Sequence, residues 1–312
     1  MRALVTGGAG LVGSEIVDAL LNRGGVEVVS IDNYSAGTSK NLEYAKNFSN
    51  FTEFRGDIRD QEFLKSIFDS GFDWVFHEAV SKNTICLVDP LSDLSTNAAG
   101  TLSLLQFFRA SKSGRFIHAS TGSVYGRTSS FPTAEDTQTL PVSFYGNSKL
   151  AAENYVRLFY ELYGIEMNIL RYFHVFGSRQ DSSKTGGVVP HFINLALNDS
   201  NIEVTGDGNQ IRAFTHVSDI ARINLLCAES ALHGQIVNCA SDARVSINSL
   251  AEKVLKLIPL SKSRIVHTPE RLGDIYKFDI STQKLQSGFG FKSFRDFDNS
   301  LELTIQEFIK QK

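Results

Sequence analysis

Residues 6–14 read TGGAGLVGS, and this glycine-rich stretch directly follows the apolar start of the chain. Gly7 allows a tight turn, Gly10 lets the backbone approach a pyrophosphate, and Gly13 lets the next helix pack closely on the strand. The free N–H groups of the helix N-terminus can bind phosphates without a lysine. The stretch therefore predicts a strand, a turn and a helix that bind a dinucleotide. The residues expected to contact it here are Gly7, Gly10, Leu11 and Val12.

An acidic residue follows the next apolar run. Asp32 lies where a carboxylate, about 20 residues after the glycine-rich turn, accepts hydrogen bonds from an adenosine ribose and repels a 2′-phosphate. Asn33, next in the chain, is expected to contact the same ligand. This arrangement favours NAD over NADP.

Short β-rich runs alternate with amphipathic stretches through the first half of the chain. The predicted strands are residues 3–5, 26–31, 74–77, 116–119 and 167–171. The predicted helices are residues 12–22, 61–70, 94–109 and 146–163. Helices of this length can connect neighbouring parallel strands. The pattern predicts an α/β, Rossmann-type, doubly wound parallel sheet with helices on both faces.

The pattern changes after Tyr172, where a loop-like stretch leads into mixed short strands and helices. We expect an NAD-binding domain over residues 1–172 and a smaller mixed α/β substrate lobe over residues 173–312, with an approximate, interleaved boundary. No long Pro- or Ser-rich linker separates them, so the lobes should share an interface and enclose the ligand in a cleft.

Composition narrows the choice of partners. The formal net charge is -3 and the pI is near 6.2, so no basic field favours nucleic acid or an anionic membrane surface. No apolar run approaches the roughly 18 residues of a membrane span, and the glycine-rich turn begins too soon after Met1 for an export signal. We expect a cytoplasmic protein. Its three scattered cysteines predict reduced thiols and no metal site.

Residues 144–153 read FYGNSKLAAE, so Tyr145 and Lys149 stand four residues apart on one helix face. A tyrosine that acts as a base near neutral pH must ionise about 3 units below its usual pKa of about 10, which requires about 4 kcal/mol. A cation about 4 Å away supplies about 4 kcal/mol at an effective dielectric constant of about 20. The pair predicts a proton acceptor, although the same spacing is common on helix surfaces.

A run of hydroxyl side chains closes the strand predicted at residues 116–119. Residues 119–126 read ASTGSVYG, which places Ser120 and Thr121 at the carboxyl edge of the sheet, where ligands bind. Thr121 is the candidate hydrogen-bonding partner of a substrate hydroxyl. A Ser- and Thr-rich turn that caps itself would have the same composition.

Three elements together resemble the extended short-chain dehydrogenase/reductase family: the glycine-rich turn with its acidic residue, the Tyr145 and Lys149 pair, and the hydroxyl run at 119–126. The resemblance is in particular to its UDP-glucose 4-epimerase-like branch of nucleotide-sugar epimerases and dehydratases. The resemblance spans nearly the whole chain and implies NAD as the cofactor, Tyr145, Lys149 and Thr121 as the catalytic residues, and a homodimer. The further residues that it implies for the cofactor are Asp57, Ile58, His77, Ala79, Asn97, Ser120, Tyr145, Lys149 and Tyr172.

Three segments after residue 170 are similar to those that hold the nucleoside diphosphate of the substrate: RYFHVFG at 171–177, GDGNQIR at 206–212 and RLGD at 271–274. Guanidinium groups suit phosphate oxygens, so Arg212 and Arg271 are expected to anchor the diphosphate. The residues expected to bind the substrate are Lys82, Thr121, His174, Val188, Arg212, Arg271 and Asp274.

The resemblance implies chemistry at C4 of the sugar. Tyr145 would take the 4-hydroxyl proton while NAD accepts the C4 hydride, and the 4-keto sugar would turn over and take the hydride back on its other face. Related dehydratases follow the hydroxyl residue with Asp-Glu, whereas this chain has Gly122 and Ser123. We therefore expect 4-epimerisation of a UDP-hexose, UDP-N-acetylhexosamine or UDP-uronic acid.

Other functions remain as alternatives. A dehydratase could take its acids from elsewhere in the chain. A net reductase that consumes NADPH is disfavoured by Asp32, and a non-catalytic NAD sensor is disfavoured by the presence of both Tyr145 and Lys149.

Two departures from the family pattern concern the sugar. Lys82 lies in an unusual segment, VSKNT at 80–84, and could meet a sugar carboxylate, although a solvated lysine is the alternative. His174 stands where many relatives have asparagine. Along the helix predicted at 146–163, apolar residues such as Val156 are expected in a dimer surface or in the core.

Overall fold

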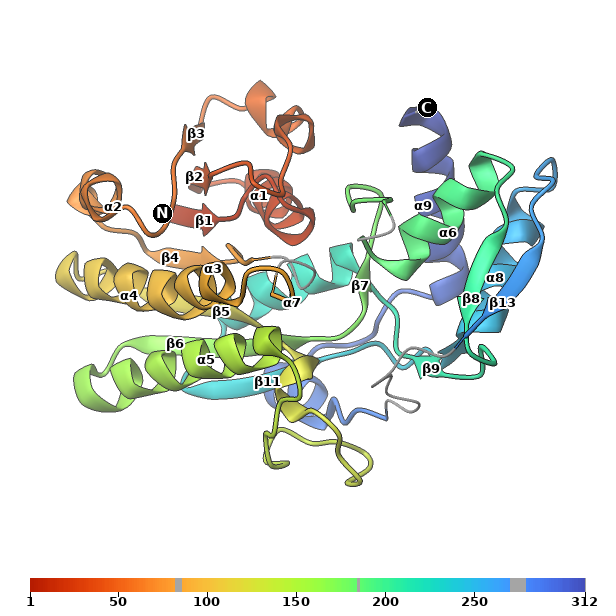
Figure 1. Ribbon diagram of the computed structural model, residues 1–312. Helices are drawn as coiled ribbons and strands as arrows, with labels where there is room; N and C mark the ends of the chain where they lie inside the picture. The colour runs from red at the N-terminus through yellow and green to blue at the C-terminus, as the bar shows by residue number, and fades with distance from the viewer. Residues whose placement is uncertain (82–85, 184–185, 270–278, 312) are drawn as a thin grey trace.

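The chain alternates strands and helices through its first 172 residues, as predicted. The computed structural model describes residues 1–81, 86–183, 186–269 and 279–311 (Figure 1). Its strands are β1 (Arg2–Thr6), β2 (Glu27–Asp32), β3 (Phe51–Arg55), β4 (Trp74–His77), β5 (Arg115–Thr121), β6 (Glu166–Tyr172), β7 (Val175–Phe176), β8 (Ile202–Thr205), β9 (Ile211–Arg212), β10 (Thr215–His216), β11 (Gln235–Cys239), β12 (Val245–Ser246) and β13 (Ile265–Thr268). Its helices are α1 (Leu11–Arg23), α2 (Gln61–Ile67), α3 (Pro90–Leu94), α4 (Gly100–Ala110), α5 (Phe144–Tyr163), α6 (Val188–Leu197), α7 (Val217–Glu229), α8 (Ile247–Leu257) and α9 (Phe297–Gln311).

The main sheet of the described chain is parallel, with strand order β11-β6-β5-β4-β1-β2-β3. The strands β1, β2 and β3 proceed in one direction across the sheet, and β4, β5, β6 and β11 proceed in the other. The order therefore reverses between β1 and β4. In doubly wound sheets a crevice forms outside the carboxyl ends of the strands at this point, and ligands bind there.

Helices cover both faces of this sheet, as expected. On one face, α1 and α7 pack against a core that includes Val5, Ile16 and Ile223; on the other, α2, α4 and α5 pack against a core that includes Leu4 and Phe116 (Figure 1). The alternate residues Leu4 and Val5 of β1 are both fully buried, which is typical of a parallel strand covered on two sides.

A second lobe lies beside the carboxyl edge of the sheet, built mainly from α6, α8, α9 and the β8–β13 pair (Figure 1). It has its own core, which contains Phe176, Phe192, Leu250 and Leu301. The chain returns to the first lobe between these elements, because β11 pairs with β6 and α7 packs on α1. The main sheet thus includes a strand from beyond residue 172.

Two strands and one helix differ from the sequence pattern. β3 and β11 were not predicted; each lies at an edge of the sheet, and β3 is only partly buried and therefore lacks a continuous apolar run. The helix predicted at 94–109 is α3, a π-helical turn at Ser95–Ala99 and α4 in succession. π-helical turns of this kind are often found at functional sites.

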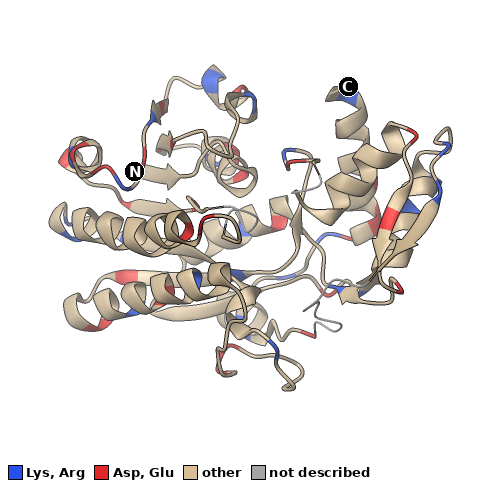
Figure 2. Cartoon of the chain, in the orientation of Figure 1, with Lys and Arg blue, Asp and Glu red and all other residues tan. Residues whose placement is uncertain are grey.

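Charged residues are interspersed along the drawn chain, with Lys and Arg alternating with Asp and Glu over both lobes (Figure 2). Among the described residues, no helix is long and apolar enough to cross a membrane. In the same residues, no group of three or more His, Cys, Asp or Glu side chains could hold a metal ion.

Candidate active site

The glycine-rich turn lies at the point where the strand order reverses. Gly7 follows β1 with φ +66°, and a Cβ atom added there would come within 2.7 Å of the backbone nitrogen of Ala79, which follows β4. Only glycine allows this conformation and this approach without strain. Helix α1 begins at Leu11, so the backbone N–H groups of its first turn, including those of Leu11 and Val12, are available to a phosphate.

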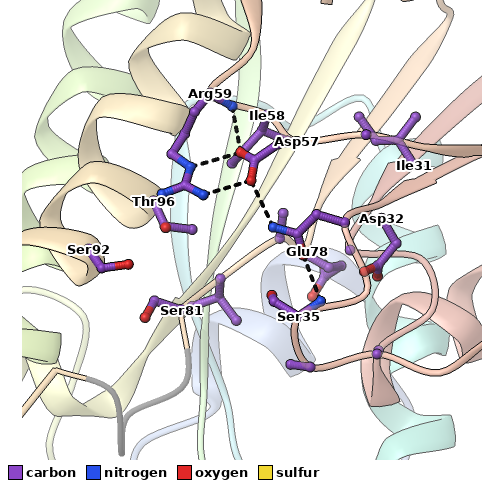
Figure 3. A pocket seen from close by; sticks show the side chains of 18 residues that line it. Ile31, Asp32, Ser35, Asp57, Ile58, Arg59, Glu78, Ser81, Ser92 and Thr96 are labelled. Atoms are coloured by element: carbon purple, nitrogen blue, oxygen red, sulfur yellow. Dashed lines mark hydrogen bonds and ion pairs between the residues drawn. The ribbon is translucent and has the colours of Figure 1, made fainter. Parts of the chain in front are cut away.

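The end of the cleft that is predicted to bind adenosine, called the adenosine end below, is formed by side chains that follow β2 and β3 (Figure 3). Asp32 is 8% exposed and accepts hydrogen bonds from the backbone N–H groups of Ala9 (2.9 Å) and Tyr34 (2.7 Å). Asn33 donates to Asp57 at 2.8 Å. The guanidinium of Arg59 donates to the same carboxylate at 2.9 and 2.8 Å, and the backbone N–H of Arg59 donates at 2.9 Å. These contacts hold the pKa of Asp57 well below its usual range.

Seven of the predicted cofactor residues line this cleft: Gly7, Gly10, Asp32, Asn33, Asp57, Ile58 and Ala79. The side chains of two other predicted cofactor residues form hydrogen bonds within the protein. His77 is 1% exposed and its ring nitrogens pair with the hydroxyls of Thr6 (2.7 Å) and Thr101 (2.8 Å). Burial lowers the pKa of His77 to about 3, so its ring is neutral.

Asn97 is the second of these internal residues. The π-helical turn carries it, and its amide donates to Ser148 of α5 at 2.9 Å and to Asp93 at 3.0 Å, while its oxygen accepts from the backbone of Ser81 at 2.8 Å. Asn97 is fully buried. The residue therefore ties α5 to the segment that follows β4.

Helix α5 presents Tyr145 and Lys149 to the carboxyl edge of the sheet. The side chain of Ser143 caps the helix by accepting the N–H of Gly146 at 3.0 Å. A Cβ atom at Gly146 would come within 2.8 Å of the Ser123 carbonyl oxygen, so glycine lets the first turn approach the end of β5. Tyr145 is partly buried, and Lys149, one turn further on, is 2% exposed.

Burial raises the pKa of Tyr145 to about 12, although a hydrogen bond with Thr121 opposes the rise. A phenolate at neutral pH then requires about 5 units, or about 7 kcal/mol, which is more than an exposed tyrosine would require. Burial also lowers the pKa of Lys149, to about 8, while Glu78, Glu153 and Asp93 oppose it. Lys149 is therefore still mostly an ammonium ion at neutral pH.

Thr121 ends β5 beside Tyr172, its register partner at the end of β6. Its hydroxyl accepts the backbone N–H of Ser123 at 3.1 Å and contacts the Ser123 hydroxyl at 3.2 Å. The structure thus places Thr121, from one motif, in hydrogen-bonding contact with Tyr145, from another, with Lys149 one helical turn further along α5.

Beneath Thr121, the side chain of Ser120 donates to Glu153 of α5. Glu153 forms an ion pair with Arg171 of β6, with contacts of 3.0 and 2.7 Å, and both side chains are at most 3% exposed. Ser120 therefore acts within the protein and fixes α5 against β5 and β6.

At the other end of the site, the structure brings His174 close to Arg212. His174 has φ 43°, a left-handed conformation that is uncommon outside glycine, and its ring meets that of Phe214 edge to face. Burial and the charge of Arg212 lower the pKa of His174 to about 3. Val188 begins α6. The predicted substrate residues Lys82, Arg271 and Asp274 lie outside the described residues.

Three side chains at the site were missed by the sequence analysis. Arg59 and Glu78 line the cleft, and Asp93 is 1% exposed and acts electrostatically on both Tyr145 and Lys149. Glu78 lies between His77 and Ala79, both of which were predicted as cofactor residues, but its hydrogen-bonding partner Tyr172 lies 94 residues away. Arg59 could have been predicted from the local sequence, since it follows the predicted cofactor residue Asp57 by two residues.

The residues of the cleft fit NAD. Gly7 has no side chain to block a pyrophosphate, and the N-terminus of α1 offers N–H groups to it. The carboxylate of Asp32 can bind a ribose that lacks a 2′-phosphate.

The chain is similar in sequence and structure to known proteins of one family. A model of the NAD dependent epimerase/dehydratase family matches residues 3–240. A UDP-glucose 4-epimerase of Thermotoga maritima, solved with UDP-glucose, is 32% identical, with a TM-score of 0.93 over 100% of this chain and 99% of that chain. A UDP-N-acetylglucosamine 4-epimerase of Methanobrevibacter ruminantium M1, solved with UDP-N-acetylmuramic acid, is 34% identical, with a TM-score of 0.93 over 100% and 99%.

Curated relatives agree with these structures. A UDP-glucose 4-epimerase of Mycolicibacterium smegmatis is 30% identical over 99% of this chain and 98% of that protein. Dehydratases of nucleotide sugars also occur among the relatives, and structures of similar epimerases contain NAD. The predicted fold class, the family resemblance and the dependence on NAD are confirmed. The chain belongs to the NAD dependent epimerase/dehydratase family.

Proposed function

We propose that the chain epimerises a UDP-sugar at C4 through a 4-keto intermediate. The observation that carries this proposal is the placement of Tyr145 against Thr121, one helical turn from the buried Lys149, beside a cleft that fits NAD. In this proposal Tyr145 removes and returns the proton of the 4-hydroxyl, and Thr121 orients that hydroxyl by hydrogen bonding. Lys149 stabilises the phenolate by its charge. NAD held in the cleft lined by Gly7, Asp32 and Asp57 would supply a reversible hydride acceptor and a positive charge.

The substrate's diphosphate is assigned to the second lobe. Arg212 has a guanidinium that suits phosphate oxygens, and the neutral ring of His174 beside it can donate one hydrogen bond. We assign the same role to Arg271. Anchoring the diphosphate on residues other than those that contact the reacting hydroxyl would leave the sugar free to turn over between the two hydride transfers.

Epimerisation is favoured over dehydration by the end of β5. Gly122 and Ser123 follow Thr121, where the related dehydratases carry two acids, and a Cβ atom at Gly122 would come within 2.2 Å of the Phe173 ring. A larger side chain therefore has no space at Gly122. Dehydration is the second candidate because two buried acids, Glu78 and Asp93, act on Tyr145 from other elements.

Product analysis separates the two reactions. Purified protein incubated with UDP-glucose, UDP-N-acetylglucosamine, UDP-glucuronic acid and dTDP-glucose should give an isomer of one UDP-sugar, with unchanged mass and an NMR spectrum inverted at C4. Loss of one water from the product would instead support dehydration. Neither product from any of the four, with NAD bound, would contradict the proposal.

We also propose a homodimer formed through α3 and α5, which pack side by side. Val156 and Phe159 of α5 lie in the core, whereas the exposed apolar side chains lie on the outer face of the two helices. These side chains are Leu91 (76% exposed), Leu94 (49%), Tyr155 (37%), Leu158 (47%) and Leu162 (66%). A second copy that presents the same face would cover this apolar stripe by two-fold symmetry.

Sedimentation analysis tests the dimer. Replacing Leu158 and Leu162 by glutamate should convert the dimer into a monomer, while Leu260→Glu, at a 92% exposed position in the second lobe, should not. A monomeric wild-type protein at micromolar concentration would exclude it. We further propose a cytoplasmic location, since Cys227 and Cys239 are buried and are not joined in a disulfide, as is typical of a reducing compartment.

A further inference from the structure

Three carboxylates act electrostatically on the buried ammonium of Lys149, and they come from three different elements. Glu153 lies on α5, Asp93 on α3, and Glu78 directly after β4. Glu153 is already paired with Arg171, and Asp93 accepts a hydrogen bond from Asn97 at 3.0 Å. Of the three, Glu78 has the largest effect on Lys149.

Glu78 is 8% exposed and is held by a hydrogen-bonded chain. The hydroxyl of Tyr172 donates to Glu78 Oε1 at 2.9 Å, and Asn224 Nδ2 of α7 donates to the Tyr172 oxygen at 2.8 Å. Asn224 Nδ2 also donates to the carbonyl oxygen of Ile220 at 2.9 Å, which fixes the amide orientation because a carbonyl can only accept. The Tyr172 proton must then point at Glu78.

This chain connects the two strands on either side of β5. Glu78 follows β4 and Tyr172 ends β6, and β5 lies between them. Thr121 ends β5, so the carboxylate is fixed at the same edge of the sheet as this proposed catalytic residue. A hydrogen bond donated to a carboxylate favours its ionised form. The chain therefore supports a negative charge at this position.

Opposed effects act on Glu78. Burial raises its pKa to about 7, while the Tyr172 hydrogen bond and the charge of Lys149 lower it. The other titratable groups that it faces are Tyr145 of α5 and Cys239 of β11. The carboxyl therefore gains its charge near neutral pH, where burial alone would keep it neutral.

The charge of Glu78 acts mainly on Lys149. On Tyr145 its effect follows those of burial, Thr121, Asp93 and Cys86. Lys149 also faces two imidazoles, His77 of β4 and His118 of β5, and burial lowers the pKa of each, so both are neutral above about pH 6. Removing the charge of Glu78 should therefore chiefly lower the pKa of Lys149, so that less of it is in the ammonium form.

We infer that Glu78 is a positioning residue whose carboxylate, fixed by Tyr172 and Asn224, keeps Lys149 in its ammonium form at the alkaline end of the working pH range. The inference rests on the roles proposed for Tyr145 and Lys149. It assigns a functional role to a negative charge beside the proposed pair of Tyr145 and Lys149.

Glu78→Gln tests the inference, because the amide oxygen can still accept the Tyr172 hydrogen bond while the charge is lost. In a profile of kcat from pH 5.5 to 10, the alkaline limb should move about one pH unit towards acid, so that activity at pH 9 relative to the optimum falls about tenfold. The matched control is Glu161→Gln at an exposed position of α5, which should keep the wild-type limb. An unmoved limb in Glu78→Gln would overturn the inference.

A second readout does not depend on turnover. In protein labelled with ¹³C-lysine, the Cε signal of Lys149, identified by its loss in Lys149→Met, should titrate about one pH unit lower in Glu78→Gln. If that variant does not fold, Tyr172→Phe should give a smaller shift in the same direction. An unchanged midpoint in the folded variant that is measured would refute the inference.

Tyr145→Phe separates this inference from the proposed function. If that variant turns over at the wild-type rate, the assignment of the base fails. If it is inactive and Glu78→Gln keeps the wild-type midpoint, the role of Glu78 alone fails.

Discussion

The two ends of the cleft hold their charges in different ways. At the adenosine end, Asp57 and Arg59 are two residues apart, 24% and 41% exposed, and pair with each other. At the catalytic end, Glu78 and Lys149 are almost completely buried, and their partners come from other strands and helices. One carboxyl pKa falls well below its usual range, while the other rises to about 7.

The two ends thus differ in how the charge of a carboxylate is stabilised: by a sequence neighbour at one end, and by distant elements of the fold at the other. An exposed ion pair formed by neighbours in sequence depends on few other parts of the fold, here the Asn33 amide that also donates to Asp57, and contributes little free energy. A buried charge depends on every element that compensates it, so a single substitution has large effects. We therefore expect variants to differ sharply in severity between the two ends.

The largest effect is expected for Tyr145→Phe at the catalytic end. Because only the proton acceptor is removed, kcat should fall about 1,000- to 10,000-fold, or about 4 to 5.5 kcal/mol in activation free energy, with NAD content unchanged. Steady-state kinetics and the absorbance of released cofactor measure both quantities. A variant with more than a tenth of the wild-type kcat would remove the proposed base.

The next largest effect is expected for Glu153→Gln, which leaves the guanidinium of Arg171 buried without its counter-charge. The free energy of unfolding should fall by about 3 kcal/mol. The control is Glu161→Gln, whose pair with Arg157 spans 3.9 Å and is 52% and 61% exposed, and which should cost less than about 0.5 kcal/mol. Equal losses in urea denaturation would show that burial does not distinguish the pairs.

A smaller effect concerns pH. The pKa of Glu78 is raised from 4.5 to about 7, so the folded protein binds more protons than the unfolded chain between these values, and this contribution to stability is lost as pH rises. Glu78→Gln lacks it, and comparing the two proteins cancels the histidine contributions. The wild type minus variant difference in unfolding free energy should fall by about 2 kcal/mol from pH 5 to 7. A constant difference would contradict the raised pKa.

The smallest effect is expected at the adenosine end. Asp57→Asn removes half of an exposed pair, so the loss of unfolding free energy should stay below about 1 kcal/mol at pH 7. Because the pKa of Asp57 is lowered, this contribution is fully present above the ordinary carboxyl value of 3.8 and is lost only at more acidic pH, as pH falls through the lowered pKa of the folded protein. Chemical denaturation at pH 7 measures the loss; a loss as large as that of Glu153→Gln would contradict the expected difference between the two ends of the cleft.

The same contrast explains how much of the molecule the sequence could predict. Gly7, Asp32, Tyr145 and Lys149 belong to short motifs whose spacing reflects one turn or one helix, and the structure places them where these motifs require. Glu78 gains its significance from Tyr172, which is distant in sequence, and no local pattern contains that pairing.

Edge elements were harder to predict for a related reason. β11 owes its place to pairing with β6, and β3 is half exposed, so neither carries the continuous apolar run of a central strand. Tertiary pairing decided both, and such pairing cannot be read from local periodicity.

The return of the chain into the first lobe means that the lobes cannot be separated as modules. Cutting after residue 172 would remove β11 from the edge of the sheet and α7 from the face of α1, leaving Leu170 and Ile16 facing water. The core on the α1 side of the sheet would be divided between the two fragments, whereas the core of the second lobe lies wholly after residue 172. Any recombination that exchanged substrate lobes between relatives would have to replace three or more separate stretches at once, so new sugar preferences are more readily reached by point substitution than by domain shuffling.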